Sequence, residues 1–176
     1  MPQPTPLRAG APKGRAMGNP SPDFELTLAT EPALIAAAQR LRYDVFVTEL
    51  GGSGPGVDHE ARRETDRFDA YAEHLLLIDR RVSENLGVVG CYRLLSPQGA
   101  QGAGGFYCAS EFDLGPLLQG TANVLELGRS CLHPAYRGGT AMFELWSGLS
   151  RLIAEREVAT LFGVASFPGT DLELLA

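Results

Sequence analysis

The chain has 176 residues, a length that suits one domain with a sizeable core, and 44% of its residues are hydrophobic. Its formal net charge of -6 argues against broad nucleic-acid binding, because duplex binders usually carry a clustered basic surface. Lys13 is the only lysine, so the positive charge is almost entirely arginine, whose guanidinium makes planar, bidentate contacts to carboxylate or phosphate.

The cysteine content and the absence of long apolar runs indicate the compartment. Cys91, Cys108 and Cys131 leave at least one thiol unpaired and lack the C-x-x-C spacing of a metal site. This favours a reducing environment with no disulfide and no zinc. No stretch approaches the roughly 18 apolar residues that cross a bilayer, and the N-terminus lacks the apolar run of a secretory signal. We therefore expect a cytoplasmic protein.

Residues 1–22 differ in composition from the rest of the chain. They hold much of the proline, are broken by glycine, and carry Arg8, Lys13 and Arg15 with no acidic residue before Asp23. We expect a disordered basic tail, followed by one domain over residues 23–176. The tail is either dispensable or a basic arm that touches anionic lipid headgroups.

The first half of the domain predicts a strand and then a helix. Residues 23–29 alternate apolar and polar side chains, as a strand does. Thr30 is the expected cap of a helix that has Pro32 in its first turn. The apolar stripe of that helix consists of Leu34, Ala38, Leu41 and Val45. The glycine-rich run 51–56 ends it and begins a mobile, charged connection to about Asp69.

The middle of the chain predicts antiparallel strands. The apolar runs 74–79 and 87–95 are joined by a polar turn and predict a hairpin. A glycine-rich insertion over residues 99–105 follows. Residues 124–132 then predict a further strand, which Pro134 ends.

The last part of the chain predicts a helix and a strand. After Gly139, an amphipathic helix is indicated by the spacing of Met142, Leu145, Trp146, Leu149, Leu152 and Ile153. Residues 161–165 predict a buried strand, and residues 171–176 resemble the opening turn of a further helix. The order β-α-β-β-β-α-β predicts a mixed α/β fold that is incomplete at its C-terminus.

Residues 125–140 form the sharpest local signal, a strand that leads through a turn and two glycines into a helix. Free N–H groups at a helix N-terminus attract an anion, and Arg137 adds a fixed positive charge beside them. We predict a phosphate site here. The alternative is a tight turn that uses glycine only for its conformation.

Gly128 lies between Glu126 and Arg129, whose offset of three would send them to opposite faces of a strand. A β-bulge at the glycine would place both on one face and free a backbone N–H for the oxyanion of an attacked thioester. Glu126 is then a candidate base for the attacking amine. A structural salt bridge between Glu126 and Arg129 is the alternative.

Four features follow one another along the chain: Arg42-x-x-x-Phe46, Asp66-x-x-Asp69, Arg93 in Cys-Tyr-Arg-Leu, and Glu126-x-x-Arg129. Taken in order, they resemble the signature of the acyl-homoserine lactone synthases, which use acyl carrier protein thioesters within a GNAT-like fold. By themselves, the first two pairs are more typical of a solvated face.

Longer segments lie between about Leu41 and Asp171, among them Leu-Arg-Tyr-Asp-Val-Phe-Val and Glu-Leu-Gly-Arg-Ser-Cys-Leu-His-Pro-Ala-Tyr-Arg-Gly-Gly-Thr. These segments resemble more closely the L-ornithine N-acyltransferases, which make lyso-ornithine lipid. The lactone synthases usually have a tryptophan in the loop after the first helix. This chain has residues 51–56 there, and its only tryptophan is Trp146, which counts against that group.

The resemblance implies a GNAT-like mixed sheet flanked by helices, with Glu126 and Arg129 as catalytic residues and Glu126 as the base. Asp66 and Asp69 would suit the amines of ornithine, and Arg93 or Arg129 its carboxylate. Arg42 and Phe46 complete the acceptor site. The implied acyl-donor site consists of Ser130, Cys131, Leu132, Arg137, Gly138, Gly139 and Thr140. A small, inert Cys131 is favoured over an acyl-enzyme nucleophile.

The implied reaction moves a (3-hydroxy)acyl group from acyl carrier protein to the α-amino group of ornithine, without a metal or redox cofactor. Acyl carrier protein is acidic, so a local basic patch is expected near Arg137, Arg151 and Arg156. The lipid product implies peripheral contact with the inner membrane. The alternatives are an acyl-homoserine lactone synthase-like enzyme, an acetyl-CoA-dependent acetyltransferase and a non-catalytic acyl-binding module.

Overall fold

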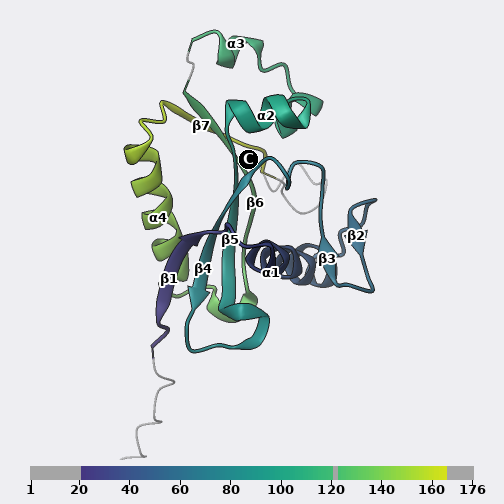
Figure 1. Ribbon diagram of the computed structural model, residues 1–176, viewed down its shortest axis with the longest axis vertical. Helices are drawn as coiled ribbons and strands as arrows, with labels where there is room; N and C mark the ends of the chain where they lie inside the picture. Colours follow the sequence, from purple (N-terminus) through teal and green to yellow (C-terminus); the bar gives the residue numbers. More distant parts are fainter. Residues whose placement is uncertain (1–20, 121–122, 166–176) are drawn as a thin grey trace, which may run out of the picture.

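The computed structural model describes residues 21–120 and 123–165 (Figure 1). The strands are β1 (Phe24–Leu28), β2 (Val57–Asp58), β3 (Arg63–Glu64), β4 (Glu73–Asp79), β5 (Val88–Leu95), β6 (Val124–Leu132) and β7 (Thr160–Phe162). The helices are α1 (Pro32–Arg42), the π-helix η1 (Tyr43–Glu49), α2 (Pro97–Ala103), α3 (Gly115–Leu118) and α4 (Ala141–Glu155). Short 3-10 turns are η2 (Glu84–Gly87), η3 (Tyr107–Ser110) and η4 (Pro134–Tyr136). The predicted helical turn 171–176 and residues 1–20 of the predicted tail lie outside the described residues.

A five-stranded sheet in the order β1-β4-β5-β6-β7 forms the centre of the molecule. The pairs from β1 to β6 are antiparallel, whereas β6 and β7 run parallel, so the prediction of a mixed α/β fold is confirmed. Helix α4 covers one face of this sheet and α1 the other (Figure 1). Within the described residues, no helix is both long and apolar enough to cross a membrane.

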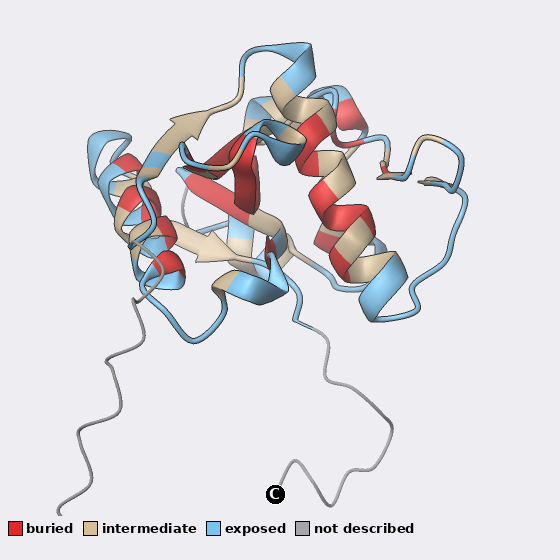
Figure 2. Cartoon of the chain, turned by 90° about the horizontal axis from the view of Figure 1, so that it is seen from below, coloured by how far each residue is buried: buried red, intermediate tan, exposed pale blue. Residues whose placement is uncertain are grey.

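The central strands are apolar on both faces because both faces are covered. Leu75 and Leu77 pack in the cluster that includes Leu145 and Leu149 of α4. Leu76, between them, packs in the α1 cluster, as the two-residue period of a strand requires. Figure 2 shows buried residues gathered where the helices face the sheet. Every residue of β5 is buried, so the charged Arg93 within it must find partners inside the protein.

The start and end of the first helix differ from the prediction. Glu31, and not Thr30, is the N-cap of α1, and it makes no side-chain cap. Pro32 occupies the first helical position, where its missing N–H would have had no partner within the helix. Beyond Arg42 the chain continues as the π-helix η1, a transition that hydrophobic spacing does not reveal.

Two segments expected to be irregular contain regular structure. The connection to Asp69 includes the β2–β3 hairpin, with Val57 paired to Glu64. Most of the glycine-rich insertion forms α2, because the Ser96 side chain caps its start. Gly104, at φ +81°, ends α2 in the left-handed conformation that glycine adopts without strain.

Helix α4 has a narrower buried face than its sequence indicates. Leu145, Leu149 and Leu152 are buried as predicted, but Met142 and Trp146 are 41% and 46% exposed. The helix lies so close to β1 that a Cβ on Gly148 would stand 2.6 Å from a Leu26 methyl carbon. One narrow stripe therefore makes the contact, and Trp146 lies at its margin with its ring centroid 6.1 Å from that of Tyr92.

Candidate active site

A β-bulge is present on β6, but it lies at Arg129 and Ser130, just after the predicted position at Gly128. Cys91 pairs with Cys131 and Arg93 pairs with Gly128, so Arg129 and Ser130 together stand opposite the single residue Tyr92. Arg129 has φ +50°, an uncommon conformation for a residue with a side chain. The bulge turns Arg129 to the face of the sheet on which Arg93 lies, because both side chains reach Asp66.

Arg42, at the end of α1, is fully buried and binds two carboxylates. Its Nη1 and Nη2 donate to the two oxygens of Asp69 at 2.8 and 3.1 Å, and its Nε donates to Glu64 at 2.6 Å. This paired geometry fits a guanidinium and satisfies charges that burial would otherwise make costly.

Arg93 and Arg129 extend these contacts into one charge network. Arg93 Nη1 donates to Asp66 at 2.5 Å and to Asp69 at 3.2 Å. Arg129 donates through Nε to Glu64 at 3.0 Å and through Nη2 to Asp66 at 3.1 Å. We call this set the charge network. It joins Arg42, Arg93 and Arg129 to Glu64, Asp66 and Asp69.

Within the charge network, Arg42 and Asp69 each favour the charged form of the other. Burial alone would raise the pKa of Asp69, but hydrogen bonds from Arg42 and the charges of Arg42 and Arg93 hold that pKa below its ordinary value. Burial alone would lower the pKa of Arg42, but Asp69 and Glu64 raise it above its ordinary value. Sequence reasoning missed Glu64, although the alternation of acidic residues in Glu64-Thr-Asp66 was an available signal.

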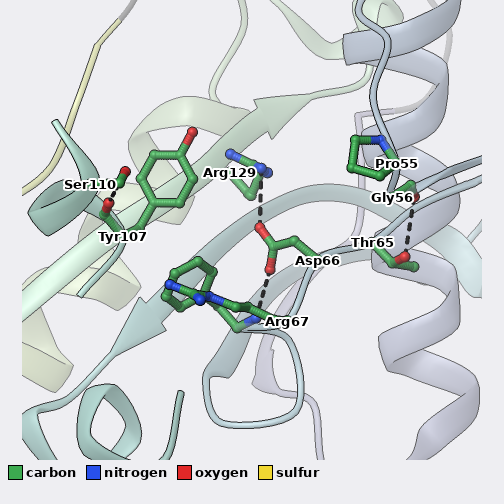
Figure 3. A pocket seen from close by; sticks show the side chains of 9 residues that line it. Pro55, Gly56, Thr65, Asp66, Arg67, Tyr107, Ser110 and Arg129 are labelled. Atoms are coloured by element: carbon green, nitrogen blue, oxygen red, sulfur yellow. Dashed lines mark hydrogen bonds and ion pairs between the residues drawn. The ribbon is translucent and has the colours of Figure 1, made fainter. Parts of the chain in front are cut away.

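The charge network opens into a pocket of about 560 Å³ (Figure 3). Asp66 and Arg129 line it, together with Pro55, Gly56, Thr65, Arg67, Phe68, Tyr107 and Ser110. Arg129 lies over the Tyr107 ring, with its guanidinium carbon 5.1 Å from the ring centroid, and the Phe68 ring meets the edge of Tyr107 at 5.6 Å. The pocket therefore has both a charged and an aromatic wall. Sequence reasoning did not single out Arg67 or Tyr107.

Glu126 is buried beside this pocket and makes contacts that its spacing did not predict. Its two carboxylate oxygens accept the backbone N–H groups of Tyr107 at 2.8 Å and Cys108 at 2.7 Å. In the described part of the chain it forms no ion pair with Arg129, so the salt-bridge alternative is wrong. Glu126 instead satisfies the first free N–H groups of η3 and fixes Tyr107 at the pocket wall.

The residues of the predicted acyl-donor site are distributed along β6 and the turn after it. Ser130 is exposed, whereas Leu132 is in the α4 core. Cys131 is buried with its Sγ 3.5 Å from that of Cys91. The contact with Cys91 and burial raise the pKa of the Cys131 thiol, which argues against a nucleophilic thiolate.

Arg137 is anchored within the protein. Its guanidinium donates to both oxygens of Glu49 at 2.5 and 2.7 Å and to the carbonyl of Leu132. Gly138 follows with φ +76°, and α4 begins at Ala141, where first-turn N–H groups lack intrahelical partners. A second pocket, of about 600 Å³, is lined here by Arg137, Gly139, Thr140, Ala141 and neighbouring residues.

Phe46 does not line the charge-network pocket. It is partly buried and packs against the α1 core that includes Leu41 and Val45. The spacing of Arg42 and Phe46 therefore brings only Arg42 into the charge network.

The parallel pairing of β6 and β7 is short. It runs from Val124 opposite Thr160 to Glu126 opposite Phe162, whereas β6 continues to Leu132. Just after β7, Gly163 approaches the strand so closely that a Cβ would stand 2.4 Å from the carbonyl oxygen of Leu127. Within the described residues, the second half of β6 thus has a strand partner on the β5 side only.

Comparison with known proteins shows the family of this chain. The family described as acetyltransferase (GNAT) domain matches residues 41–147, which include the charge network, the bulge and the start of α4. The chain belongs to the GNAT acetyltransferase family. The predicted GNAT-like fold is thereby confirmed.

Two curated relatives are similar over most of this GNAT chain. The L-ornithine N(alpha)-acyltransferase of Rhodobacter capsulatus is 51% identical over 154 residues, which are 86% of this chain and 60% of the relative. The enzyme of the same name from Brucella abortus is 40% identical over 150 residues, 83% of this chain and 53% of the relative. The chain thus spans little more than half the length of these relatives.

Solved structures show the same fold at low sequence identity. The AHL synthase LasI aligns with a TM-score of 0.57 at 20% identity, over 83% of this chain and 74% of that one. The CoA-dependent acyl-homoserine lactone synthase BjaI aligns with a TM-score of 0.55 at 20% identity, over 74% of this chain and 58% of that one.

Proposed function

We propose that this GNAT domain belongs to an N-acyltransferase that moves a (3-hydroxy)acyl group from acyl carrier protein to the α-amino group of L-ornithine. The observation that carries the proposal is a buried charge network that opens, through Asp66 and Arg129, into a pocket beside the β6 bulge. The relatives named L-ornithine N(alpha)-acyltransferase support ornithine as the acceptor.

The acceptor would enter the pocket next to Asp66 and Arg129. Asp66 offers negative charge to an ammonium group, and Arg129 lies beside it with its own charge shared between Glu64 and Asp66. Arg42, Asp69 and Arg93 are buried behind them, at 0%, 8% and 3% exposure, so we assign to these three the role of holding Asp66 and Arg129 in place.

The reaction needs a neutral amine and a stabilised oxyanion. Amino groups of amino acids are protonated at neutral pH, so one proton must leave before the nitrogen attacks the thioester. Glu126 is our proposed base, and an amine or a water would have to reach one of its oxygens beside the N–H groups of Tyr107 and Cys108. A backbone N–H of the bulge at Arg129 and Ser130 would donate to the oxyanion, and the carrier's thiolate would leave.

The acyl donor would follow the second half of β6 to the turn before α4. The phosphate of its phosphopantetheine arm is a ligand suited to the free N–H groups at the start of α4. Arg137 is paired with Glu49, so it holds this turn in shape as well as adding positive charge to it. Acyl carrier protein as the partner, and contact of the enzyme with the inner membrane, belong to the same proposal.

Thioester consumption by the purified protein tests this proposal. We expect 3-hydroxyacyl carrier protein to release free thiol when ornithine is added, and Glu126→Ala to slow the release at least about a hundredfold, as loss of a general base does. Thiol release at an unchanged rate in Glu126→Ala would contradict a catalytic role for Glu126. Carrier-protein binding without thiol release would favour a non-catalytic acyl-binding module.

A further inference from the structure

Arg67 is an exposed arginine that lines the charge-network pocket. Its guanidinium carbon lies 4.8 Å from the ring centroid of Phe68, which is itself buried. Figure 3 shows the Arg67 side chain extending past Asp66 toward the side of the pocket where Tyr107 lies. The aromatic contact thus holds a positive charge at the pocket wall.

Arg67 and Arg129, the two arginines that line the pocket, differ in their partners. Arg129 uses Nε on Glu64 and Nη2 on Asp66, and the charge network matches three arginines with three carboxylates. In the described part of the chain, Arg67 has an aromatic partner but no carboxylate partner. It therefore adds a positive charge that a ligand can neutralise.

We infer that Arg67 binds the α-carboxylate of the acceptor amino acid, an inference that rests on the proposed N-acyltransferase function. A guanidinium presents two parallel N–H donors to a carboxylate. Stacking on Phe68 restricts the arginine before binding, which reduces the entropy lost when the ligand arrives. Because one carbon joins the carboxylate to the α-amino group, this contact fixes where the amine stands relative to Asp66. Arg67 is thus a specificity residue for the carboxylate of the acceptor.

The test compares ornithine with 1,4-diaminobutane, which has the same carbon chain and amines without the carboxylate. We expect Arg67→Met to raise the KM for ornithine roughly tenfold or more, the usual effect of losing one charge-assisted hydrogen bond. The KM for 1,4-diaminobutane should stay unchanged, and Arg67→Lys should recover part of the loss. The matched control is Arg62→Met, because Arg62 is also exposed and stacks on an aromatic ring, that of Tyr43 at 5.2 Å, but does not line the pocket.

Three results would overturn the inference. The first is that Arg67→Met impairs both amines equally, and the second is that it leaves ornithine unaffected. The third is a changed KM for the acyl carrier protein thioester, which would assign the charge to the donor. If the wild-type protein acylates neither amine, the proposed function fails. Calorimetric binding of the two amines then tests the inference separately from the proposed function. The inference is supported if Arg67→Met loses binding of ornithine but keeps binding of 1,4-diaminobutane. It is contradicted if wild type and Arg67→Met bind ornithine equally.

Discussion

Arg42 shows at the residue scale what the charge network requires. It is fully buried, and its guanidinium is shared by Glu64 and Asp69. Arg42→Met keeps an apolar stem but leaves both carboxylates without this partner. Breaking a buried ion pair in this way costs about 3–5 kcal/mol. We expect the free energy of unfolding, measured by urea denaturation, to fall by that amount.

Arg62→Met is the comparison for Arg42→Met. Arg62 pairs with Asp44 at the surface, where both side chains are about half exposed. Removal of such a pair should change the free energy of unfolding by less than about 1 kcal/mol. Equal stabilities of the two variants would contradict the view that the charge network is a buried, mutually dependent unit.

The sequence predicted part of this site. The structure brings together five of the residues that the resemblance singled out, namely Arg42, Asp66, Asp69, Arg93 and Arg129. Spacing alone had left Arg42, Asp66 and Asp69 as part of a solvated face. Glu64 and Tyr107 were not predicted. The acidic alternation Glu64-Thr-Asp66 was an available signal for the first. The position of Tyr107 depends on the Glu126 contact to η3, a long-range feature without a local pattern.

At the element scale, the close approach of the chain after β7 to β6 depends on Gly163. A Cβ there would stand 2.4 Å from the Leu127 carbonyl oxygen, a backbone atom that cannot rotate away. Gly163→Ala should therefore force the strands apart and lower the free energy of unfolding by about 1–3 kcal/mol, as overpacking does. Because the acyl donor is proposed to lie along the free half of β6, the KM for the thioester should rise as well.

Gly120→Ala is the matched control, since a Cβ at Gly120 would meet nothing within 4 Å. It should leave the free energy of unfolding within about 0.5 kcal/mol of wild type. A Gly163→Ala protein that is as stable as Gly120→Ala, with an unchanged KM for the thioester, would remove Gly163 from the account of the donor site.

The predicted elements were most accurate where a strong period exists. The strands around 74–79, 87–95 and 124–132 follow apolar runs, and both faces of the sheet are covered as such runs require. Helix α2 was missed because three glycines in residues 97–104 obscured a cap at Ser96. The π-helix η1 was missed because helical spacing does not distinguish it from an α-helix end.

At the scale of the whole molecule, the sheet brings distant segments to one place. The end of α1, the connection before β4, the middle of β5, η3 and the bulge of β6 all contribute to the charge network or its pocket. The net charge of -6 gave no indication of this site, because its own charges nearly cancel. The relatives that are 51% and 40% identical are longer than this chain, which covers 60% and 53% of them. The acceptor and the acyl donor of this chain are therefore the points to test.

A product assay by mass spectrometry tests the central claim most directly. The purified protein is given 3-hydroxyacyl carrier protein and acetyl-CoA as competing donors, with ornithine among a set of amino acids. The account predicts N-acylated ornithine, formed from the carrier-protein donor and more abundant than any other acylated amino acid. Products that carry only acetyl groups, or acylation that ignores ornithine, would contradict it.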